Sequence, residues 1–490
     1  MLPRYYRPVF MGTFVAFVSL LGAAHAQTTS LLRMATFDVD ATPPVGSALP
    51  YSSTTAIVQP LRCRGMVLLS DEKPVVLCAV DWLGIGNDGN RIFRERLAKA
   101  AGTTPDRVAV HTLHQHDAPW CDFSADTLAK SHGATGIIFD SSVANQVVAR
   151  AADAIEASLK RPYTISQIGL GQAKVEAVGS NRRILGADGK VASVRWTATK
   201  DPHVRAAPEG VIDPWLRSIR FYEGDTPITV LTYYATHPQS YYGKGEVNPD
   251  FPGIARDIRQ SETGNLHVHF CGAAGNVGAG KYNDGSPENR KLLADRMADA
   301  MKRSIVEEKR FMVSGDDLRW TTQELRLPPT RRMDRDQLMG VIADPNKTVK
   351  ERIYAATQWV WLTRCAEGDP ILASCLKLGP ARVLHLPGEL FIEYQLAAAE
   401  MLPGEFVATA AYGDYAPCYI GTAIAYEQGG YETETRSSLV APECEGVLIE
   451  TIQKLLGVEA RSVPPLGVEA ARREVEYAKS QQAQREAMPK

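Results

Sequence analysis

The chain has 490 residues, of which 44% are hydrophobic and 22% are charged. A chain of this length and composition can bury a large core, so we exclude disordered, collagen-like and coiled-coil proteins. Lys and Arg number 54 and Asp and Glu number 56, which gives a formal charge of −2 and disfavours bulk electrostatic binding of a polyanion. We therefore expect a folded protein with no nucleic-acid partner.

The N-terminus has the pattern of an export signal. Arg4 and Arg7 precede an apolar run over residues 9–21, and Ala24-His25-Ala26 supplies a small-x-small cleavage pattern. The run is too short for a membrane span, and no later stretch reaches about 18 uninterrupted apolar residues. We expect residues 1–26 to be a signal peptide and the mature protein to be secreted or periplasmic, with no transmembrane segment.

Apolar, β-branched runs alternate with helical patterns along the rest of the chain. We interpret as strands the runs 61–69, 75–83, 107–110, 163–178, 228–235, 266–271, 383–386 and 406–411. We interpret as helices the patterns 90–101, 143–159, 288–306, 390–401 and 445–456. The polar, proline-bearing stretches 196–211 and 326–350 are interpreted as loops, because the same alternation continues on either side of them.

This alternation predicts an α/β fold, with one large domain of mixed sheets flanked by helices over residues 27–460. Residues 461–490 are charged and rich in Gln and Ala, so we expect a charged tail or a surface helix there.

Eight cysteines follow the export signal. An oxidising compartment permits disulfides, and Cys365 with Cys375 would close the least costly loop. Buried free thiols are the alternative. No CxxC pair is present, which argues against a thiolate zinc site.

Three histidines fall within six residues directly after the predicted strand 107–110, at His111, His114 and His116. Because alternate residues of an extended chain share a side, we expect His114 and His116 to face one site. Neutral imidazole is the commonest metal ligand in proteins, so the pair indicates a metal site. A polar loop with hydrogen-bonded histidines is the alternative.

Three further segments carry polar or aromatic groups at predicted strand ends. His237 ends the most apolar strand, where α/β folds assemble their sites, and Glu389 opens the predicted helix 390–401. The alternatives are a core histidine and a glutamate that complements a helix dipole. The last segment is rich in tyrosine, which is typical of a core or of a carbohydrate- or lipid-facing wall; its members are Tyr412, Tyr415, Tyr419, Tyr426 and Tyr431.

Taken in order, the motifs resemble the neutral, non-lysosomal ceramidase family. They are HxH followed by a proline, A-x-H-P, L-P-G-E, and Y-x-x-x-Y-I-x-T with another tyrosine twelve residues on. The similarity covers roughly residues 35–455 and includes the opening segment 37–44. It implies a ceramidase-like domain that binds Zn²⁺, with the metal ligands His114, His237, Glu389 and Tyr419.

The resemblance also implies the residues that carry the reaction. His116 matches the second histidine of the family motif, Tyr431 matches the tyrosine that contacts the scissile carbonyl, and Arg182 matches an arginine that follows an asparagine. We therefore expect a secreted zinc hydrolase that cleaves an N-acyl amide in a small-molecule or lipid-like substrate, with transient membrane-surface contact. The alternatives are hydrolysis of an ester or extracellular glycan, or a catalytically silent binding protein with this fold.

Two departures from the family pattern bear on the reaction. Gly278 stands where the family has the serine that is assigned as nucleophile or substrate anchor, so we expect a zinc-activated water to attack instead. About 33 residues follow Gly457, so we expect no counterpart of the family's C-terminal immunoglobulin-like domain.

The stretch 275–281 mimics a phosphate-binding loop, but Tyr282 replaces the required Ser or Thr, so we expect no nucleotide to bind there.

Polar residues surround the candidate motifs in the sequence, and we expect them to favour a polar N-acyl substrate over long-chain ceramide. They are Gln115, Asp117, Gln239, Lys281, Asn283 and Asp284. The alternative is that these side chains point to solvent and line nothing.

Overall fold

A computed structural model of the protein describes residue 1 and residues 30–486. The expected signal peptide and its cleavage site therefore lie outside the described residues. Within residues 30–486, no helix is both long enough and apolar enough to cross a membrane.

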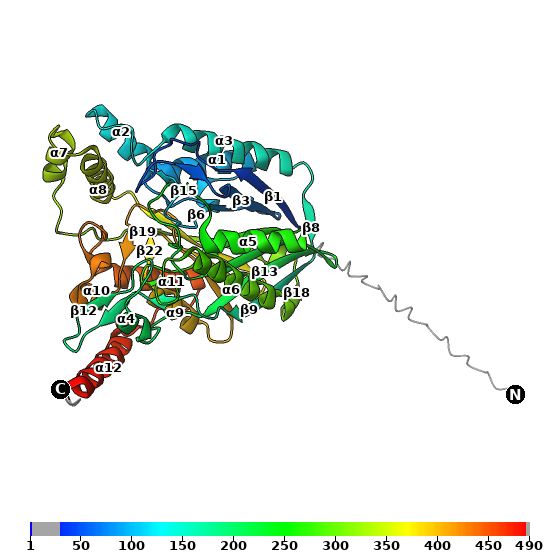
Figure 1. The fold of residues 1–490 in the computed structure, drawn as a ribbon. Coiled ribbons are helices and arrows are strands. Elements are labelled where there is room, and N and C mark those ends of the chain that lie inside the picture. Colours follow the sequence, from blue (N-terminus) through cyan, green and yellow to red (C-terminus); the bar gives the residue numbers. More distant parts are fainter. Residues whose placement is uncertain (2–29, 487–490) are drawn as a thin grey trace.

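The first of three main sheets has the strand order β6-β4-β3-β1-β8. Its strands are β1 (Leu32–Asp40), β3 (Arg62–Leu69), β4 (Val75–Val80), β6 (Val108–Thr112) and β8 (Tyr163–Ile165). Only β4 and β6 run parallel within it. Helices α1 (Asp88–Ala101) and α3 (Ser141–Ser158) pack on one of its faces (Figure 1).

The second sheet has the order β16-β14-β13-β9-β18. Its strands are β9 (Gln167–Lys174), β13 (Trp215–Glu223), β14 (Thr226–Tyr234), β16 (Leu266–Cys271) and β18 (Lys309–Met312). The parallel pair is β14 with β16. Helices α5 (Asp250–Thr263) and α6 (Pro287–Val306) cover one face.

The third sheet has the order β19-β20-β21-β23, with β21 and β23 parallel. Its strands are β19 (Leu318–Leu325), β20 (Ile371–Leu378), β21 (Ala381–His385) and β23 (Phe406–Ala410). One face packs against α8 (Val349–Glu367), α9 (Ile392–Met401) and α11 (Cys444–Leu456).

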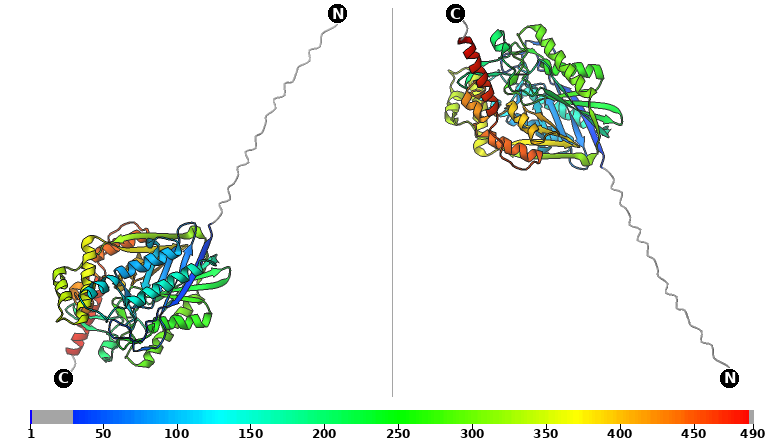
Figure 2. Two further views of the ribbon diagram at one scale, coloured as in Figure 1. Left: turned by 90° about the horizontal axis from the view of Figure 1, so that it is seen from above. Right: turned by 90° about the horizontal axis from the view of Figure 1, so that it is seen from below.

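The three sheets turn their other faces to one another and share a central core. Strand β4 illustrates the division: Val76, Cys78 and Val80 face the helices, whereas Val75, Leu77 and Ala79 enter the central core. Because successive side chains of a strand point to opposite faces, a fully buried strand serves both cores at once. Figure 2 shows the sheets stacked inside their helical covering.

Each sheet carries its parallel pair at an edge, and these edges meet. Strand β16 contacts β4, β6 and β23, and β14 contacts β23. The segments that follow β6, β14, β16, β21 and β23 therefore leave their strands at neighbouring carboxyl ends. In open α/β sheets this is where ligand sites form.

Short elements complete the described chain. The short strands are β2 (Ala56–Ile57), β5 (Gly84–Ile85), β7 (Trp120–Cys121), β10 (Ser180–Asn181), β11 (Arg183–Leu185), β12 (Val191–Val194), β15 (Glu246–Val247), β17 (Val277–Gly278), β22 (Glu389–Leu390) and β24 (Tyr419–Ile420). The remaining helices are α2 (Phe123–Ser131), α4 (Pro202–Ala206), α7 (Arg335–Ala343), α10 (Ala423–Gln428) and α12 (Val468–Glu486), with 3₁₀ turns at Pro105–Arg107, Gly315–Asp317 and Tyr431–Thr433.

The predicted α/β class, with mixed sheets flanked by helices, is confirmed, and most predicted strands and helices are present, many with shifted ends. The predicted strand 163–178 was wrong in part, because it is divided into β8 and β9, which belong to different sheets. The two predicted loops were wrong in part, because α4 lies in the first and α7 in the second. Both helices begin at an aspartate, Asp201 or Asp334, whose side chain accepts backbone N–H bonds. Caps of this kind stabilise a short helix that lacks a regular apolar stripe. The expected surface helix after residue 461 is α12.

All eight cysteines lie within residues 30–486 and carry free thiols, so the Cys365–Cys375 disulfide was wrong. The two sulfurs approach different backbone carbonyls, that of Leu327 at 3.9 Å from Cys365 and that of Leu376 at 3.7 Å from Cys375. Six of the eight are the buried free thiols considered as the alternative, whereas Cys365 and Cys418 are half-buried.

Candidate metal centre

The four predicted metal ligands all lie on segments that leave the parallel strand pairs. His114 follows β6, His237 follows β14, Glu389 follows β21, and Tyr419 follows β23. All four side chains are buried. The segment after β16 packs beside them, because Gly278 forms a parallel bridge with His237.

The backbone at this site departs from regular structure. His114 has a φ of 69°, so His114 and His116 do not share a side of an extended strand, and that part of the prediction was wrong. The turn still brings the two rings together, with centroids 5.0 Å apart. Tyr412 and Cys418 are also left-handed, at φ 59° and 55°. Such conformations cost of order 1–3 kcal/mol each and persist only where the surroundings impose them.

Glu389 and Tyr419 are direct neighbours across the parallel ladder of β22 and β24. Glu389 therefore lies on a short strand and does not open a helix as predicted, because α9 begins at Ile392. Gly275 donates its N–H to the carbonyl of Leu390 at 2.8 Å. A Cβ at residue 275 would overlap the backbone at Glu389, so this close approach requires glycine.

Three buried atoms that carry lone pairs converge between these segments. Nε2 of His114 lies 3.1 Å from Nε2 of His237, and Oε2 of Glu389 lies 3.2 and 3.7 Å from those nitrogens. Nδ1 of each imidazole faces a backbone carbonyl, that of Leu83 at 2.7 Å and that of Ala274 at 3.3 Å. These bonds place the proton on Nδ1 and leave Nε2 bare. Three acceptors this close repel one another unless a cation lies among them.

The arrangement fits a tetrahedral metal ion. Ligand atoms about 2.0–2.2 Å from a tetrahedral zinc are about 3.3–3.6 Å apart, close to the spacing found here. Oε2 of Glu389 is buried with no hydrogen-bond partner in the described part of the chain, whereas Oε1 accepts a bond from the Tyr415 hydroxyl at 2.7 Å. Burial and the nearby Arg182 hold the pKa of His237 well below its usual value, which keeps the ring neutral as a ligand requires.

His116 belongs to the same cluster but differs in its bonding. Ring nitrogens of His114, His116 and His237 all lie within 4.8 Å of one another. Nε2 of His116 already accepts an N–H bond from Gln239 at 2.8 Å, and Nδ1 faces the carbonyl of Pro238 at 3.3 Å. Because its lone pair is taken, His116 fits a place beside the metal ligands better than a place among them. Burial, with the neighbouring His114, lowers the pKa of His116 well below its usual value.

Arg182 spans the two tyrosines that the sequence assigns to the site. Its guanidinium donates to the Tyr419 hydroxyl at 3.0 Å and to the Gly275 carbonyl at 2.6 Å. It also lies over the rings of Tyr419 and Tyr431, at 5.5 and 5.1 Å from their centroids. Burial raises the pKa of both tyrosines although Arg182 opposes the shift, so both hydroxyls stay protonated in the metal-free protein.

Position 278, where the family serine was expected, lies at the site. A Cβ on Gly278 would be 3.3 Å from Cδ of Arg182 and 3.6 Å from Cβ of His237. Because residue 278 is glycine, no side chain from this position lies beside the cluster. The next serine along the chain is Ser286. Its side chain caps α6 by accepting the N–H of Asn289.

Most of the polar residues expected to line the site bond elsewhere. Gln239 contacts His116, as described above. The other five are engaged with backbone groups: Gln115 with Asp81, Asp117 with Lys244 and Gly245, Lys281 with Arg205 and Ala207, Asn283 with Thr197, and Asp284 with Ser286. These five residues are therefore held by backbone groups, and the polar wall stays a prediction.

Aromatic rings surround the cluster instead. Tyr51 stacks on His116 with centroids 5.5 Å apart, and Tyr242 lies 4.9 Å from Tyr51. On the other side, Trp196 stacks on Tyr431 at 4.9 Å. The outer rings are solvent-accessible, with Tyr51, Tyr242 and Trp196 exposed by 36%, 46% and 57%.

Sequence reasoning gave no role to two residues that the geometry places at the centre. Tyr415 holds Glu389, and Gln239 holds His116. Tyr415 stood in the tyrosine-rich segment, but nothing in its spacing separated it from the other tyrosines. Gln239 lies two residues after His237 and was noted only as polar.

Comparison with known proteins bears on the fold. No protein-family model matches the chain, and no curated protein matches its sequence. Among solved structures, the neutral ceramidase from Pseudomonas aeruginosa matches with a TM-score of 0.63 and 15% identity, over 89% of this chain and 76% of that chain. A ceramidase complexed with C2 matches with a TM-score of 0.62 and 15% identity, over 89% of this chain and 77% of that chain.

The chain has a ceramidase-like fold. The fold predicted from the ordered motifs is thereby confirmed. Independently of these comparisons, the buried group of His114, His116 and His237 could hold a metal ion.

The Tyr415 hydroxyl fixes which oxygen of Glu389 faces the histidines, so Tyr415→Phe should weaken metal binding. Loss of such an outer contact costs about 10–100-fold in metal affinity. Competition with a chelator would measure this affinity. Tyr394→Phe is a matched control, because that buried hydroxyl bonds to the Gly421 carbonyl instead. Equal affinity in wild type and Tyr415→Phe would contradict the assignment.

Proposed function

We propose that the protein is a secreted or periplasmic zinc-dependent hydrolase that cleaves an N-acyl amide bond. The observation that carries this proposal is the convergence of two bare imidazole nitrogens and an unpartnered carboxylate oxygen at 3.1–3.7 Å. The ceramidase-like fold supports the same chemistry. Export rests on the sequence pattern of residues 1–26.

His114, His237 and Glu389 would hold the zinc, and the Tyr419 hydroxyl would complete the set. Three firm ligands and a weaker Tyr419 would leave a coordination position for water. Zinc in such an open site would lower the pKa of that water toward about 7 and so supply a hydroxide nucleophile. Tyr415 orients Glu389 for this role, and the carbonyls of Leu83 and Ala274 orient the two imidazoles.

The neighbouring residues supply proton transfer and charge stabilisation. His116 is neutral, because burial depresses its pKa, and it can accept a proton at Nε2, where Gln239 now donates. Arg182 remains charged, and Tyr431 keeps its proton because burial raises the pKa of its hydroxyl. Both are donors for an oxygen that gains negative charge during attack on the carbonyl.

Gly278 favours direct attack by water over a covalent route. A serine at this position would lie beside Arg182 and His237, whereas glycine offers no nucleophile. Ser286 is engaged at the start of α6. Ser180 pairs with Gly278 across the β10–β17 ladder, but its hydroxyl donates to the Gly278 carbonyl at 3.1 Å and has no histidine partner among the described residues. We therefore favour attack by water over an acyl intermediate on serine.

For the substrate, the exposed rings of Tyr51, Tyr242 and Trp196 favour an amide with an apolar arm. We favour it over the expected polar N-acyl compound, since five of the six residues behind that expectation bond elsewhere. Rings that are 36–57% exposed offer a partly open surface to an acyl chain, and they suit transient contact with a membrane surface.

Two other functions remain alternatives. Hydrolysis of an ester or an extracellular glycan would use the same cluster, and a silent binding protein would retain the metal without turnover. Assays on matched N-acyl, ester and glycan substrates separate these alternatives, because only a true amidase releases amine from the N-acyl compound.

Metal analysis of the purified mature protein tests the ligand set. We expect about one zinc per chain in the wild type and nearly none in His114→Ala or His237→Ala, since either change removes one of three converging ligands. His269→Ala is the matched control, because His269 is equally buried but bonds to Thr232 at 2.9 Å. Full zinc content in both site variants would rule out this centre.

Direct attack by water predicts that no acyl group becomes attached to the protein. Mass spectrometry of the enzyme, quenched during turnover of a slow substrate, should find only the unmodified mass. Added hydroxylamine should yield no acyl hydroxamate above the uncatalysed background. Ser286→Ala should turn over as the wild type does, and an acylated serine would refute the route.

A series of N-acyl substrates of graded chain length tests the aromatic walls. We expect kcat/KM to rise with each methylene by less than the roughly 4-fold that full burial provides, because the rings are partly exposed. Tyr51→Ser and Trp196→Ser should flatten the rise. Tyr163→Ser is the control, since Tyr163 is 39% exposed on β8 and outside the cluster. A wild-type kcat/KM that falls with chain length would instead indicate a polar substrate.

A further inference from the structure

Glu432 is a fully buried carboxylate next to the candidate metal centre. Its exposed fraction is 0%, and it follows Tyr431 in the 3₁₀ turn Tyr431–Thr433. Two buried arginines flank it: Arg183 at 3.2 Å from Oε2 and Arg182 at 3.8 Å from Oε1. A carboxylate buried this deeply is costly unless its charge is compensated, so the two arginines and Glu432 form one electrostatic unit.

The contact between Glu432 and Arg182 is not a full hydrogen bond. Oε1 of Glu432 and Nε of Arg182 are both buried, and neither has a hydrogen-bond partner within residues 30–486. They face each other at 3.8 Å, slightly beyond hydrogen-bond length. A small movement of Arg182 along this line would satisfy both atoms.

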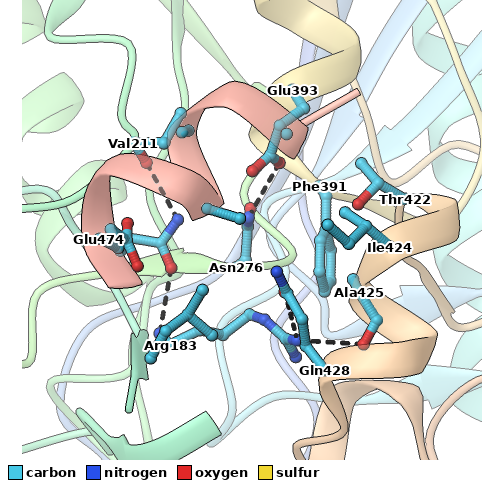
Figure 3. Close-up of a pocket in the computed structure, with 15 residues that line it drawn as sticks. Arg183, Val211, Asn276, Phe391, Glu393, Thr422, Ile424, Ala425, Gln428 and Glu474 are labelled. Atoms are coloured by element: carbon cyan, nitrogen blue, oxygen red, sulfur yellow. Dashed lines mark hydrogen bonds between the residues drawn. The ribbon is translucent and has the colours of Figure 1, made fainter. Parts of the chain in front are cut away.

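Arg183 anchors the carboxylate from the opposite side. Its guanidinium also donates to the Ala425 carbonyl at 3.1 Å and to Gln428 at 3.3 Å, both on α10. Figure 3 shows Arg183 reaching toward these residues across a pocket that α12 covers, with Glu474 on that helix. Because successive residues point to opposite sides, Arg182 reaches the tyrosines of the metal centre while Arg183 lines this separate pocket.

We propose that Glu432 is a positioning residue that holds Arg182 over Tyr419 and Tyr431, so that the guanidinium meets the substrate carbonyl. This inference rests on the proposed function. The carboxylate offsets one of two adjacent positive charges and leaves a net positive charge beside the cluster. Without it, Arg182 and Arg183 would repel each other, and the fork that touches the Tyr419 hydroxyl would lose its fixed orientation.

The charge balance also explains the surrounding backbone. Gly430 precedes Tyr431 with a φ of 91°, and a Cβ there would lie 2.8 Å from the Arg183 guanidinium and 3.0 Å from Glu432. The turn therefore requires glycine at residue 430, because the ion pair between Arg183 and Glu432 lies against it. The same turn directs Tyr431 toward the cluster and Glu432 toward the two arginines.

The test compares Glu432→Gln with a matched control. The control, Glu308→Gln, removes a carboxylate in a similar setting. The Glu308 side chain is 6% exposed and lies between Arg220 at 3.8 Å and Arg310 at 3.5 Å, beside a tyrosine hydroxyl. It directly precedes β18, the edge strand of the second sheet opposite β16. In zinc-loaded protein, Glu432→Gln should lower kcat roughly 10–100-fold with KM within about 2-fold, because a misplaced donor costs rate more than ground-state binding. Zinc content should stay unchanged, and Glu308→Gln should keep the wild-type kcat.

Binding of acetohydroxamate to the zinc-loaded protein gives a readout that needs no turnover. Its two oxygens would be held at the zinc, where Arg182 could donate a hydrogen bond to one of them. Calorimetry should therefore find weaker binding in Glu432→Gln by roughly 10-fold or more and no change in Glu308→Gln. If the wild type hydrolyses no N-acyl substrate, the proposed function fails while this measurement still decides the role of Glu432. If Glu432→Gln does not fold, Glu432→Asp replaces it as the test variant. Aspartate keeps the negative charge but is shorter, so the charge lies farther from Arg182, and we expect smaller losses of kcat and of hydroxamate affinity. The proposal would be overturned if the folded Glu432 variant kept the wild-type kcat and hydroxamate affinity. It would also be overturned if Glu308→Gln lost as much of either quantity as the Glu432 variant.

Discussion

The closeness of three unprotonated acceptors is the constraint on which the site depends. Two imidazole nitrogens and a carboxylate oxygen converge at 3.1–3.7 Å, and backbone carbonyls fix the proton of each imidazole on the far side of the ring. The fold tolerates this concentration of lone pairs only if a cation compensates it. The neighbouring groups follow from the same need, since Tyr415 holds one carboxylate oxygen and Arg182 holds the tyrosine beside it.

Three sheets cooperate to build this constraint. Each brings one parallel strand pair to a common meeting point, and each uses its inner face for a shared core and its outer face for helices. The alternation along β4 makes such a double role possible, because every second side chain serves a different core. The loops at the meeting point are consequently held on several sides, which is what lets His114, Tyr412 and Cys418 keep left-handed backbones.

The sequence predicted the fold class and the identity of the clustered residues better than their local geometry. Apolar periodicity located β4, β14 and α6, because these elements bury regular faces. It missed α8, whose apolar residues are divided between two cores and leave no single stripe. The ordered motifs named His114, His237 and Glu389, yet the turn at His114 and the short strand at Glu389 arise from tertiary contacts that spacing does not encode. Tyr415 and Glu432 were invisible as functional residues, because their importance lies in which atoms they reach.

The scattered origin of the cluster has a consequence for how the protein folds. His114 and His237 are separated by 123 positions in the chain, and Glu389 lies on the segment that follows β21 of the third sheet. Contacts between residues so distant in sequence form late, after the entropy of closing long loops has been overcome. The full ligand set can therefore form only after the sheets have come together, and a correctly formed centre reports that all three sheets have docked. An ion bound there would in turn tie the three sheets together and slow the opening of any one of them.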